Sequence, residues 1–567
     1  MRMRTIALCS LALWVASGCG NRQGGADREF ATLRDAYLAK YEPLYREQAV
    51  AWWDANITGS DSLFARKSEI DKRLVDLHSD RETFAVLKRL HEAHSVRDSL
   101  EQRELDVMYR TCLPQQADPA LLKRIVDLEN EVEQRFNVFR GTVDGRSLSE
   151  NDIREIIATS KDSHQVEAAW KAYMAVGAEN ADRLRELVKL RNDVARGLGY
   201  RDWFALSLTV QDIDENELMA LFDELDTLTR EPFAQAKAQL DRDRAARFGI
   251  DVAALRPWHY GDLFFQQAPT ASDSLDIDAL FEGKDVVELA RKYYAGIGLP
   301  ADDILARSDL FEKPGKSPHA FCSDMDHAGD IRVLANLRAD ATSMGTILHE
   351  LGHGVYSKGC RADIPFLLKD APNALTTEGM AELFEYFAKN EEWLRDVAGV
   401  PTERAAAIGR ATRESQRIGH LMFARWTQVM LRFEKEMYSN PDTDLGATWW
   451  NLKKEYQLLT PPESTDRPDY AAKIHVVTAP VYYHSYMMGE LFAAQVVHAL
   501  ATQVLGMSEA QALTTSFYPH PEAGAYLDEK VFGPGSTMDW RTLVRHATGE
   551  PLGARAFAAE IAETPSS

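Results

Sequence analysis

The sequence predicts a mainly α-helical protein with one large folded domain. Apolar residues recur at helical spacing along much of the chain, as in the segment 184–198, where a helix would end at Gly199. No linker rich in proline, glycine and serine and no internal repeat divides the body of the 567 residues. We therefore expect a single, predominantly helical domain over residues 30–560.

The N-terminal residues have the pattern of a bacterial lipoprotein signal. Two arginines precede an apolar run over residues 5–16, which is too short to span a membrane as a helix, and Cys19 follows small residues. We expect residues 1–18 to be a cleaved signal peptide, Cys19 to carry the lipid, and residues 19–29 to form a flexible tether. An ordinary secretory signal is the alternative. The protein would thus be secreted, or lie in the bacterial cell envelope with only its lipid anchor in the membrane.

The middle of the chain contains a connecting region and one strand candidate. Residues 256–315 are richer in proline and glycine than their surroundings, and we expect them to connect two lobes around a groove. Residues 331–337 form a short apolar run bounded by Asp330 and Arg338, which is typical of a strand. We therefore expect a small β-sheet before the helix that follows.

The motif His349-Glu350-Leu351-Gly352-His353 is the most informative stretch of the chain. Two histidines four residues apart on a helix can bind one zinc ion together, while the glutamate between them faces the reacting water. The apolar residues around the motif follow the spacing of a helix that is buried on one side: Met344, Ile347, Leu348, Leu351 and Val355. A surface helix with ordinary histidines is the alternative. The motif favours a zinc metallopeptidase.

A third protein ligand is needed, because a catalytic zinc site usually has three and leaves one position open. A second helix is expected over residues 376–384, with a threonine as its N-cap and Glu378 in its first turn. Glu378 is the candidate ligand, although the helix dipole favours an acid at this position in any helix. Glu382, one turn later, is the candidate acceptor that orients a ligating imidazole through its other nitrogen, or else a solvated acid.

Several further blocks of sequence accompany this motif. They are residues 51–58, 190–200, 319–320, 330–332, 449–457, 461–462 and 470–475. Together with HExxH and the following glutamate, they resemble the angiotensin-converting-enzyme (peptidyl-dipeptidase A) family of zinc peptidases. The resemblance implies a large helical fold of the gluzincin type, with two lobes around a deep substrate groove and a small β-sheet near the zinc helix. It also implies one zinc ion per chain, short peptide substrates, and pairing of the 331–337 strand with the substrate backbone.

The resemblance further implies roles for individual residues. Glu350 would be the general base that takes a proton from the attacking water and later delivers one to the leaving amine. Lys473 would bind the free carboxy terminus of the substrate. His475 and His319 would hydrogen-bond the peptide around the cleaved bond, with Ala320 beside His319.

The tyrosine cluster over residues 481–486 is one residue longer than in the animal enzymes. The family uses a Tyr-x-x-Tyr pair, whose first member binds the terminal carboxylate and whose second donates its phenol to the oxyanion. Tyr483 and Tyr486 have that spacing, which gives the second role to Tyr486. The number of residues between Lys473 and Tyr482 agrees better with the family than the number between Lys473 and Tyr483. The first role therefore stays open between Tyr482 and Tyr483. Other residues stand where chloride-activated members have an arginine, so chloride is not implied as a cofactor.

Charge and cysteine content restrict the possible partners. The chain has 65 basic and 87 acidic residues, a net charge of −22, which makes nucleic acid an unsuitable partner. Cys9 lies in the expected signal peptide and Cys19 would carry the lipid, which leaves Cys112, Cys322 and Cys360, an odd number that cannot pair completely. We therefore expect the body to depend on its apolar core rather than on disulfides.

These observations predict a zinc-dependent peptidase that releases dipeptides from the carboxy ends of short peptides. A carboxylate-binding glutamine of the family falls in the divergent stretch 279–285, where it has no clear counterpart. A general oligopeptidase like the thimet family is therefore one alternative, and it would not require a free carboxylate. A peptide-binding envelope lipoprotein without turnover is the other, although a purely structural zinc site would have no need of Glu350.

Overall fold

The computed structural model describes residues 17–268, 277–465 and 467–562. Helices dominate these residues, and two small antiparallel sheets accompany them, which confirms the mainly α fold class. Most of the predicted signal peptide lies outside the described residues, and so does the side chain of Cys19. None of the described helices combines the length and the apolar character that a membrane span requires.

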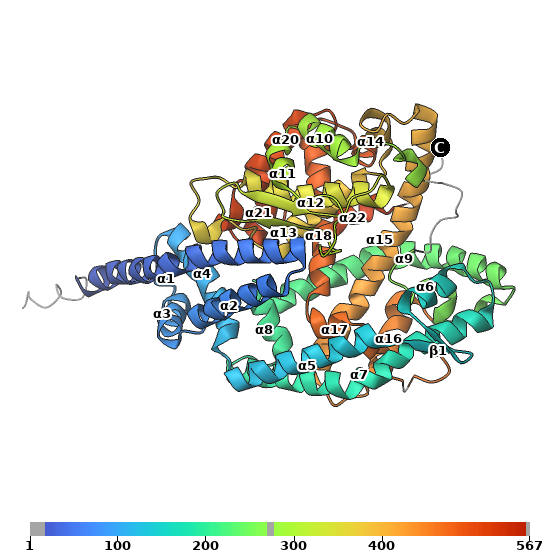
Figure 1. Cartoon of the computed structure of the whole chain (residues 1–567), viewed down its shortest axis with the longest axis horizontal. Coiled ribbons are helices and arrows are strands. Elements are labelled where there is room, and N and C mark those ends of the chain that lie inside the picture. The colour runs from blue at the N-terminus through green and yellow to red at the C-terminus, as the bar shows by residue number, and fades with distance from the viewer. Residues whose placement is uncertain (1–16, 269–276, 466, 563–567) are drawn as a thin grey trace, which may run out of the picture.

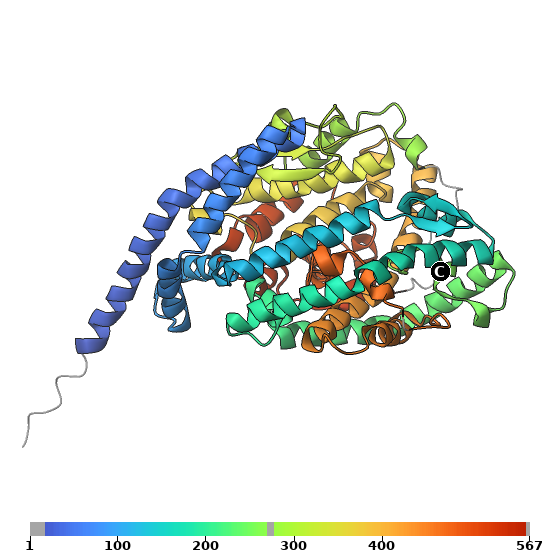
Figure 2. The same cartoon turned by 60° about the horizontal axis from the view of Figure 1, so that its bottom comes forward.

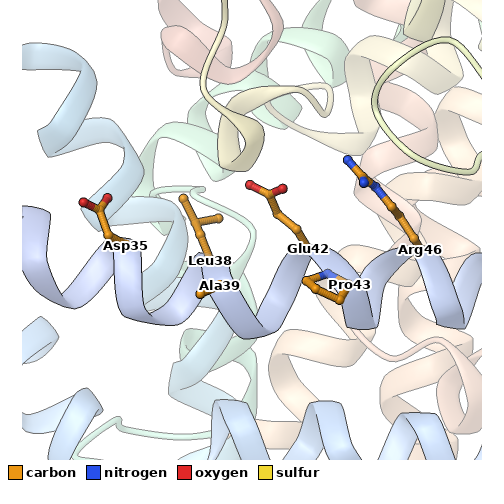
Figure 3. A pocket seen from close by; sticks show the side chains of 6 residues that line it. All are labelled: Asp35, Leu38, Ala39, Glu42, Pro43 and Arg46. Atoms are coloured by element: carbon orange, nitrogen blue, oxygen red, sulfur yellow. The ribbon is translucent and has the colours of Figure 1, made fainter.

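The N-terminal part of the chain forms a separate group of helices at one side of the body (Figure 1). They are α1 (Ser17–Thr58), α2 (Asp61–His78), α3 (Arg81–Glu92) and α4 (Ser99–Cys112). The N-terminal end of α1 projects from the body (Figure 2). One face of α1 carries a shallow hollow of about 340 Å³, lined by Asp35, Leu38, Ala39, Glu42, Pro43 and Arg46 (Figure 3). None of the predicted site residues lines this hollow.

The segment 19–29, which we expected to be a flexible tether, is helical and belongs to α1. Its last residues are fixed by contacts with the body. Ala26 is buried in a small core shared with residues of α3 and α4, and Asp27 accepts a hydrogen bond of 2.9 Å from the backbone N–H of Arg97. Glu29 pairs with Arg89 of α3 at 2.5 Å. The folded body therefore begins before residue 30, because these contacts offset the entropy lost on ordering the segment.

One half of the molecule, the lower half of Figure 1, is built mainly from the following elements. They are α5 (Pro119–Val138), α6 (Glu150–Thr159), α7 (Ser163–Gly197), α8 (Trp203–Val210), α9 (Glu215–Phe248), α16 (Leu445–Gln457) and α17 (His475–Thr478), with the hairpin of β1 (Gly141–Val143) and β2 (Arg146–Leu148). The helix predicted over residues 184–198 is the second half of α7, and Gly199 follows with a φ of +91°, which favours glycine.

The other half contains the predicted zinc helix. Its elements are α10 (Val286–Gly296), α11 (Asp302–Arg307), α12 (Ala341–Gly359), α13 (Ala374–Phe387), α14 (Glu391–Asp396), α19 (Glu509–Ala512), α20 (Pro521–Leu527), α21 (Trp540–Thr548) and α22 (Arg555–Glu560). The long helices α15 (Thr402–Ser439) and α18 (Tyr483–Ala499) run between the two halves (Figure 1). A continuous core of buried apolar side chains extends from Tyr109 to Ile561 and joins them.

The predicted small sheet near the zinc helix is present, but its free edge is not the predicted one. β3 (Phe321–Asp324) pairs antiparallel with β4 (Ile331–Leu334), which is shorter than the predicted strand 331–337. The other edge of β4 is covered, since Asp309 donates to the carbonyl of Val333 at 2.9 Å. Within the described residues β3 pairs only with β4, so β3 and not β4 offers an open edge.

Candidate metal centre

Helix α12 presents the motif as the sequence predicts. Its N-cap Asp340 accepts a hydrogen bond from the backbone N–H of Ser343, which fixes the start of the helix. The predicted apolar stripe is buried: Met344, Ile347, Leu348, Leu351 and Val355 are at most 2% exposed. The side chains of His349 and His353 lie on another face and keep 21% and 20% of their exposure. The helix therefore packs on the core with one face and presents both imidazoles with another.

Helix α13 brings Glu378 to these histidines. The helix is capped by Asn373, whose side chain accepts from Leu375 N–H, and not by the threonine that the sequence suggested. It packs closely on α12 at Gly352, where an added Cβ would lie only 3.0 Å from the Cα of Ala381. Oε2 of Glu378 lies 3.9 Å from Nε2 of His349 and 3.8 Å from Nε2 of His353.

These three side chains suit a metal ion. One ligand atom from each lies within 4.8 Å of the other two, and no other such group of three or more is found among the described residues. Two donors bound at zinc distances in a tetrahedral site are about 3.4 Å apart. Small side-chain movements would therefore bring His349, His353 and Glu378 into a zinc site of the predicted composition.

The outer nitrogens of the two imidazoles lie beside residues other than the predicted one. Nδ1 of His353 lies within hydrogen-bond distance of the hydroxyl of Thr377, at 2.7 Å. Nδ1 of His349 lies 3.2 Å from Oε2 of Glu385, which is close enough for an ion pair but lacks hydrogen-bond geometry. Glu382 contacts neither ring, and its Oε2 is buried without a hydrogen-bond partner. The structure therefore has Glu385, and not Glu382, beside the imidazole of His349.

Helix direction and the packing of α13 on α12 together explain the difference between these two acids. Residues seven apart on a helix differ in direction by about 20°, and residues four apart by about 40° in the opposite sense. The crossing of α13 over α12 brings Glu385 beside His349, whereas Glu382 lies close to Glu490 of α18. Burial and the nearby Glu490 raise the pKa of Glu382 above its usual range.

Glu350 is held between the two histidines and strand β3. Its side chain is buried, with 8% exposure for the residue, and its carboxylate lies near the backbone N–H of Cys322 in β3. Burial raises the pKa of Glu350 to about 7, against the lowering effect of His349. A carboxylate with a pKa near 7 can accept and return a proton at neutral pH, as a general base must.

Strand β3 directs part of its main chain toward this carboxylate. The backbone N–H of Met325, directly after β3, donates to the carbonyl of Asp330 at 2.8 Å. Because the backbone groups of successive strand residues point in alternate directions, the odd-numbered residues of β3 direct their N–H and C=O groups to β4. Ala320 and Cys322 occupy the alternate positions, so their backbone N–H and C=O groups point to the open edge of β3. Ala320, which precedes β3 directly, is half-buried, whereas His319 is exposed. No described contact joins His319 to the histidines of the motif.

Helix α18 meets α13 at a glycine pair. An added Cβ on Gly379 would lie 2.5 Å from the carbonyl oxygen of Gly489, so the two helices touch through their backbones. This contact brings Tyr486 close to the metal-ligand candidate. Burial, followed by the charges of Glu378 and Glu382, raises the pKa of Tyr486, which keeps its phenol protonated and able to donate.

Lys473 lies with a glutamine that sequence reasoning missed. Its Nζ donates to Oε1 of Gln266 at 2.8 Å, and the hydroxyl of Tyr483 lies 3.5 Å from the same oxygen. The ammonium also lies 5.2 Å from the ring centre of Phe264 and 5.3 Å from that of Tyr483. Tyr483 rather than Tyr482 therefore lies where it could bind a carboxylate together with Lys473.

Gln266 carries no local signal in the sequence, because it lies in an irregular segment outside the stretch 279–285 in which the glutamine was sought. Burial lowers the pKa of Lys473 to about 8. A buried ammonium with one neutral acceptor has unused hydrogen-bond capacity, which a carboxylate would satisfy.

His475 lies beside this group. Its ring centre is 5.2 Å from that of Tyr483, and its Nδ1 is buried without a hydrogen-bond partner. Burial and the charge of Lys473 lower the pKa of His475 to about 4, so the ring is neutral at pH 7. A neutral imidazole with a free nitrogen can hydrogen-bond a peptide group.

A hydrogen-bond network around Gln211 holds the segment that contains the tyrosine cluster. Val481 has a φ of +55°, which is unfavourable for a β-branched residue. Gln211 Nε2 donates to the carbonyl of Val481 at 2.9 Å, and its Oε1 lies 3.0 Å from Nε2 of His484. The side chain of Asn373 donates to the carbonyl of Gln211 at 2.7 Å. Gln211 therefore connects the N-terminus of α13 to the segment that leads into α18.

Comparison with known proteins agrees with this arrangement. The family model described as Angiotensin-converting enzyme (Peptidase M2) matches residues 27–253 and 261–558. The angiotensin-converting enzyme-like protein Ace3 of Mus musculus is 23% identical over 439 residues, which cover 71% of this chain and 57% of that protein. The angiotensin-converting enzyme of Oryctolagus cuniculus is 22% identical over 566 residues, covering 93% of this chain and 42% of the relative.

The relatives also include a protein described as inactive, the inactive angiotensin-converting enzyme-related protein of Caenorhabditis elegans. It is 21% identical over 381 residues, which cover 59% of this chain and 41% of that protein. The chain spans about half the length of the curated relatives it matches. The family match extends over most of the sequence, and the chain belongs to the angiotensin-converting enzyme family.

Proposed function

We propose that this protein is a zinc peptidase that removes dipeptides from the carboxy ends of short peptides. The observation that carries the proposal is the grouping of His349, His353 and Glu378 around one point, with Glu350 on the same helix. A structural zinc site would be closed by a fourth protein ligand and would have no use for an adjacent buried carboxylate. The donor set therefore favours a catalytic site.

The side chains around this group have complementary tasks in peptide hydrolysis. When bound, a zinc ion would polarise the scissile carbonyl and make water a better nucleophile. Glu350 accepts the proton of the attacking water and then delivers it to the leaving amine. Thr377 and Glu385 hold the imidazoles of His353 and His349 in orientation.

Substrate contacts are proposed for the residues that flank the metal ligands. The phenol of Tyr486 donates to the oxygen that becomes negatively charged in the transition state. His475 hydrogen-bonds the peptide near the cleaved bond, and the open edge of β3, which starts beside His319 and Ala320, pairs with the substrate backbone. This last role replaces the one expected for the strand over residues 331–337.

The proposed dipeptide product depends on the group formed by Lys473, Gln266 and Tyr483. These side chains offer an ammonium, an amide and a phenol to a free carboxylate. A carboxylate held at a fixed distance from the catalytic residues sets the length of the released fragment. The thimet-like alternative would instead cleave peptides without regard to the carboxy terminus.

The test is mass spectrometry of a synthetic peptide library after digestion, with and without a chelator. We expect fragments shortened in steps of two residues from the carboxy end, abolished by the chelator and restored by zinc. Carboxy-amidated copies of the same peptides should be cleaved poorly. Fragments from internal cleavage, with amidated peptides cleaved equally well, would favour the general oligopeptidase. Binding of peptides without any cleavage would favour the non-catalytic alternative, for which the relative described as inactive is a precedent within the family.

We also propose that the protein is attached to the bacterial cell envelope by a lipid on Cys19. The proposal is supported by the small residues before Cys19 and by the apolar run over residues 5–16. Fractionation of cells that express the full chain tests it, since Cys19→Ser should move the protein from the membrane fraction to the soluble one. An unchanged distribution would contradict the lipid anchor and favour an ordinary secretory signal.

A further inference from the structure

A second cavity adjoins the proposed carboxylate anchor. It has a volume of about 370 Å³ and lies between α5, α6 and α7 on one side and the segment 473–475 on the other. Its lining includes Lys473, His475, Phe264, Tyr173, Arg154 and Arg140. Lys473 and Phe264 therefore belong both to the anchor and to this cavity, so a carboxylate at the anchor would lie at the mouth of the cavity.

The walls of the cavity are cationic and aromatic. Three cations, Lys473, Arg154 and Arg140, line it together with one acid, Glu150. Arg154 pairs with Glu150 at 2.7 Å, and its guanidinium carbon lies 5.9 Å from the ring centre of Tyr173. Arg140 donates to the carbonyls of Asn137 and Phe139 and has no ion-pair partner among the described residues. The balance of charge favours an anion.

The position and the size of the cavity indicate which part of a substrate would enter it. Only one bond separates the terminal carboxylate carbon of a peptide from the Cα that carries the last side chain. With the carboxylate at Lys473, that side chain is the group closest to the cavity. A volume of about 370 Å³ is at the lower end of small-ligand sites, about 300–1,000 Å³, and suits one side chain with water better than several residues.

We propose that this cavity receives the side chain of the C-terminal residue of the substrate and that Arg154 makes it favour a carboxylate there. The aromatic rings contact the methylene groups of a glutamate side chain, and the guanidinium of Arg154 donates to its carboxylate through the N–H groups that do not face Glu150. This inference rests on the proposed function, because it takes the anchor at Lys473 as its starting point.

The test uses three acylated tripeptides that differ only in the last residue, acyl-Gly-Ala-Glu, acyl-Gly-Ala-Gln and acyl-Gly-Ala-Lys. We expect kcat/KM of the protein to be about tenfold higher for the glutamate substrate than for its isosteric glutamine counterpart, and lowest for lysine. In Arg154→Gln the ratio between glutamate and glutamine should fall to about one. Arg154→Lys keeps the charge and should retain part of the preference, while thermal unfolding shows whether each variant is folded.

Arg183→Gln is a matched control. Arg183 lies on α7, pairs with Glu131 at 2.6 Å and does not line the cavity, so its loss should leave the substrate ratio unchanged. Equal kcat/KM for glutamate and glutamine substrates in the unaltered protein, or a preference that survives Arg154→Gln, would overturn the inference while leaving the peptidase proposal intact. Failure to release a dipeptide from any of the three substrates would overturn the proposed function itself.

Discussion

The proposed anchor at Lys473 allows a quantitative prediction. Replacement by methionine keeps the length and most of the volume of the side chain and removes only the ammonium. A hydrogen bond between charged groups contributes about 1.5–3 kcal/mol, which corresponds to a change of about 10- to 150-fold in kcat/KM. We expect Lys473→Met to lower kcat/KM by this factor for peptides with a free carboxy terminus. Converting that terminus to an amide should cause a similar loss in the unaltered protein.

The two changes together provide the decisive comparison. If the ammonium acts on the terminal carboxylate, the amide should cost little or nothing in Lys473→Met, because the interaction is already absent. Steady-state kinetics on one peptide and its amide, with both proteins, completes the cycle. Lys189→Met, which removes a surface lysine that pairs with Asp442, serves as the control and should behave like the unaltered protein. Additive losses from mutation and amidation would refute the role of Lys473 as anchor.

Three other predictions concern the groups around the anchor and the metal ligands. Burial lowers the pKa of Lys473 to about 8, and binding of a carboxylate needs the charged form of the lysine. We therefore expect kcat/KM for peptides with a free carboxy terminus to fall as pH rises through 8, whereas amidated peptides should lack this decline. Identical pH profiles for the two kinds of peptide would contradict the role of Lys473. Glu385→Gln should weaken zinc binding about 10- to 100-fold in a chelator competition, while Glu382→Gln should have little effect. If Glu382→Gln weakened zinc binding and Glu385→Gln did not, Glu382 would be the residue that orients a ligating imidazole. Gln211→Ala should lower kcat/KM about tenfold with zinc content unchanged, because it removes hydrogen bonds to Val481 and His484 beside Tyr483, and an unchanged kcat/KM would contradict this. Replacing chloride by another anion at constant ionic strength should not alter activity, and strong chloride activation would contradict the expectation drawn from the absent arginine.

The parts of the site that the sequence predicted are those that lie on single helices. His349, Glu350 and His353 are fixed relative to one another by one helix, so their spacing alone predicts that they share a face. The apolar stripe that predicts the burial of α12 has the same origin. Glu378 could be found because it follows on the next helix in a recognisable motif. These features depend on local periodicity, which sequence carries directly.

The parts that the sequence did not predict depend on contacts between distant segments. Gln266 meets Lys473 across 207 positions of the chain, and nothing near Gln266 indicates this partner. The choice between Glu382 and Glu385 depends on how α13 crosses α12, which the residues of α13 alone do not reveal. The open edge of β3 follows from the covering of β4 by Asp309, again a non-local contact.

The predicted tether shows a different kind of error. Glycine and polar residues over 19–29 suggested a flexible segment, because their composition offers little apolar surface to bury. The structure nevertheless buries Ala26 and gives Asp27 a main-chain partner. A few tertiary contacts are enough to extend a helix that already exists by about three more turns, because propagation needs no new nucleus.

The most direct test of the account is the behaviour of Glu350→Gln. The amide has nearly the same shape as the carboxylate but cannot accept the proton of the attacking water. We predict that the purified variant contains one zinc ion per chain, as measured by elemental analysis, and has lost hydrolysis of short peptides by several orders of magnitude. Substantial turnover in a zinc-loaded Glu350→Gln protein would contradict the account.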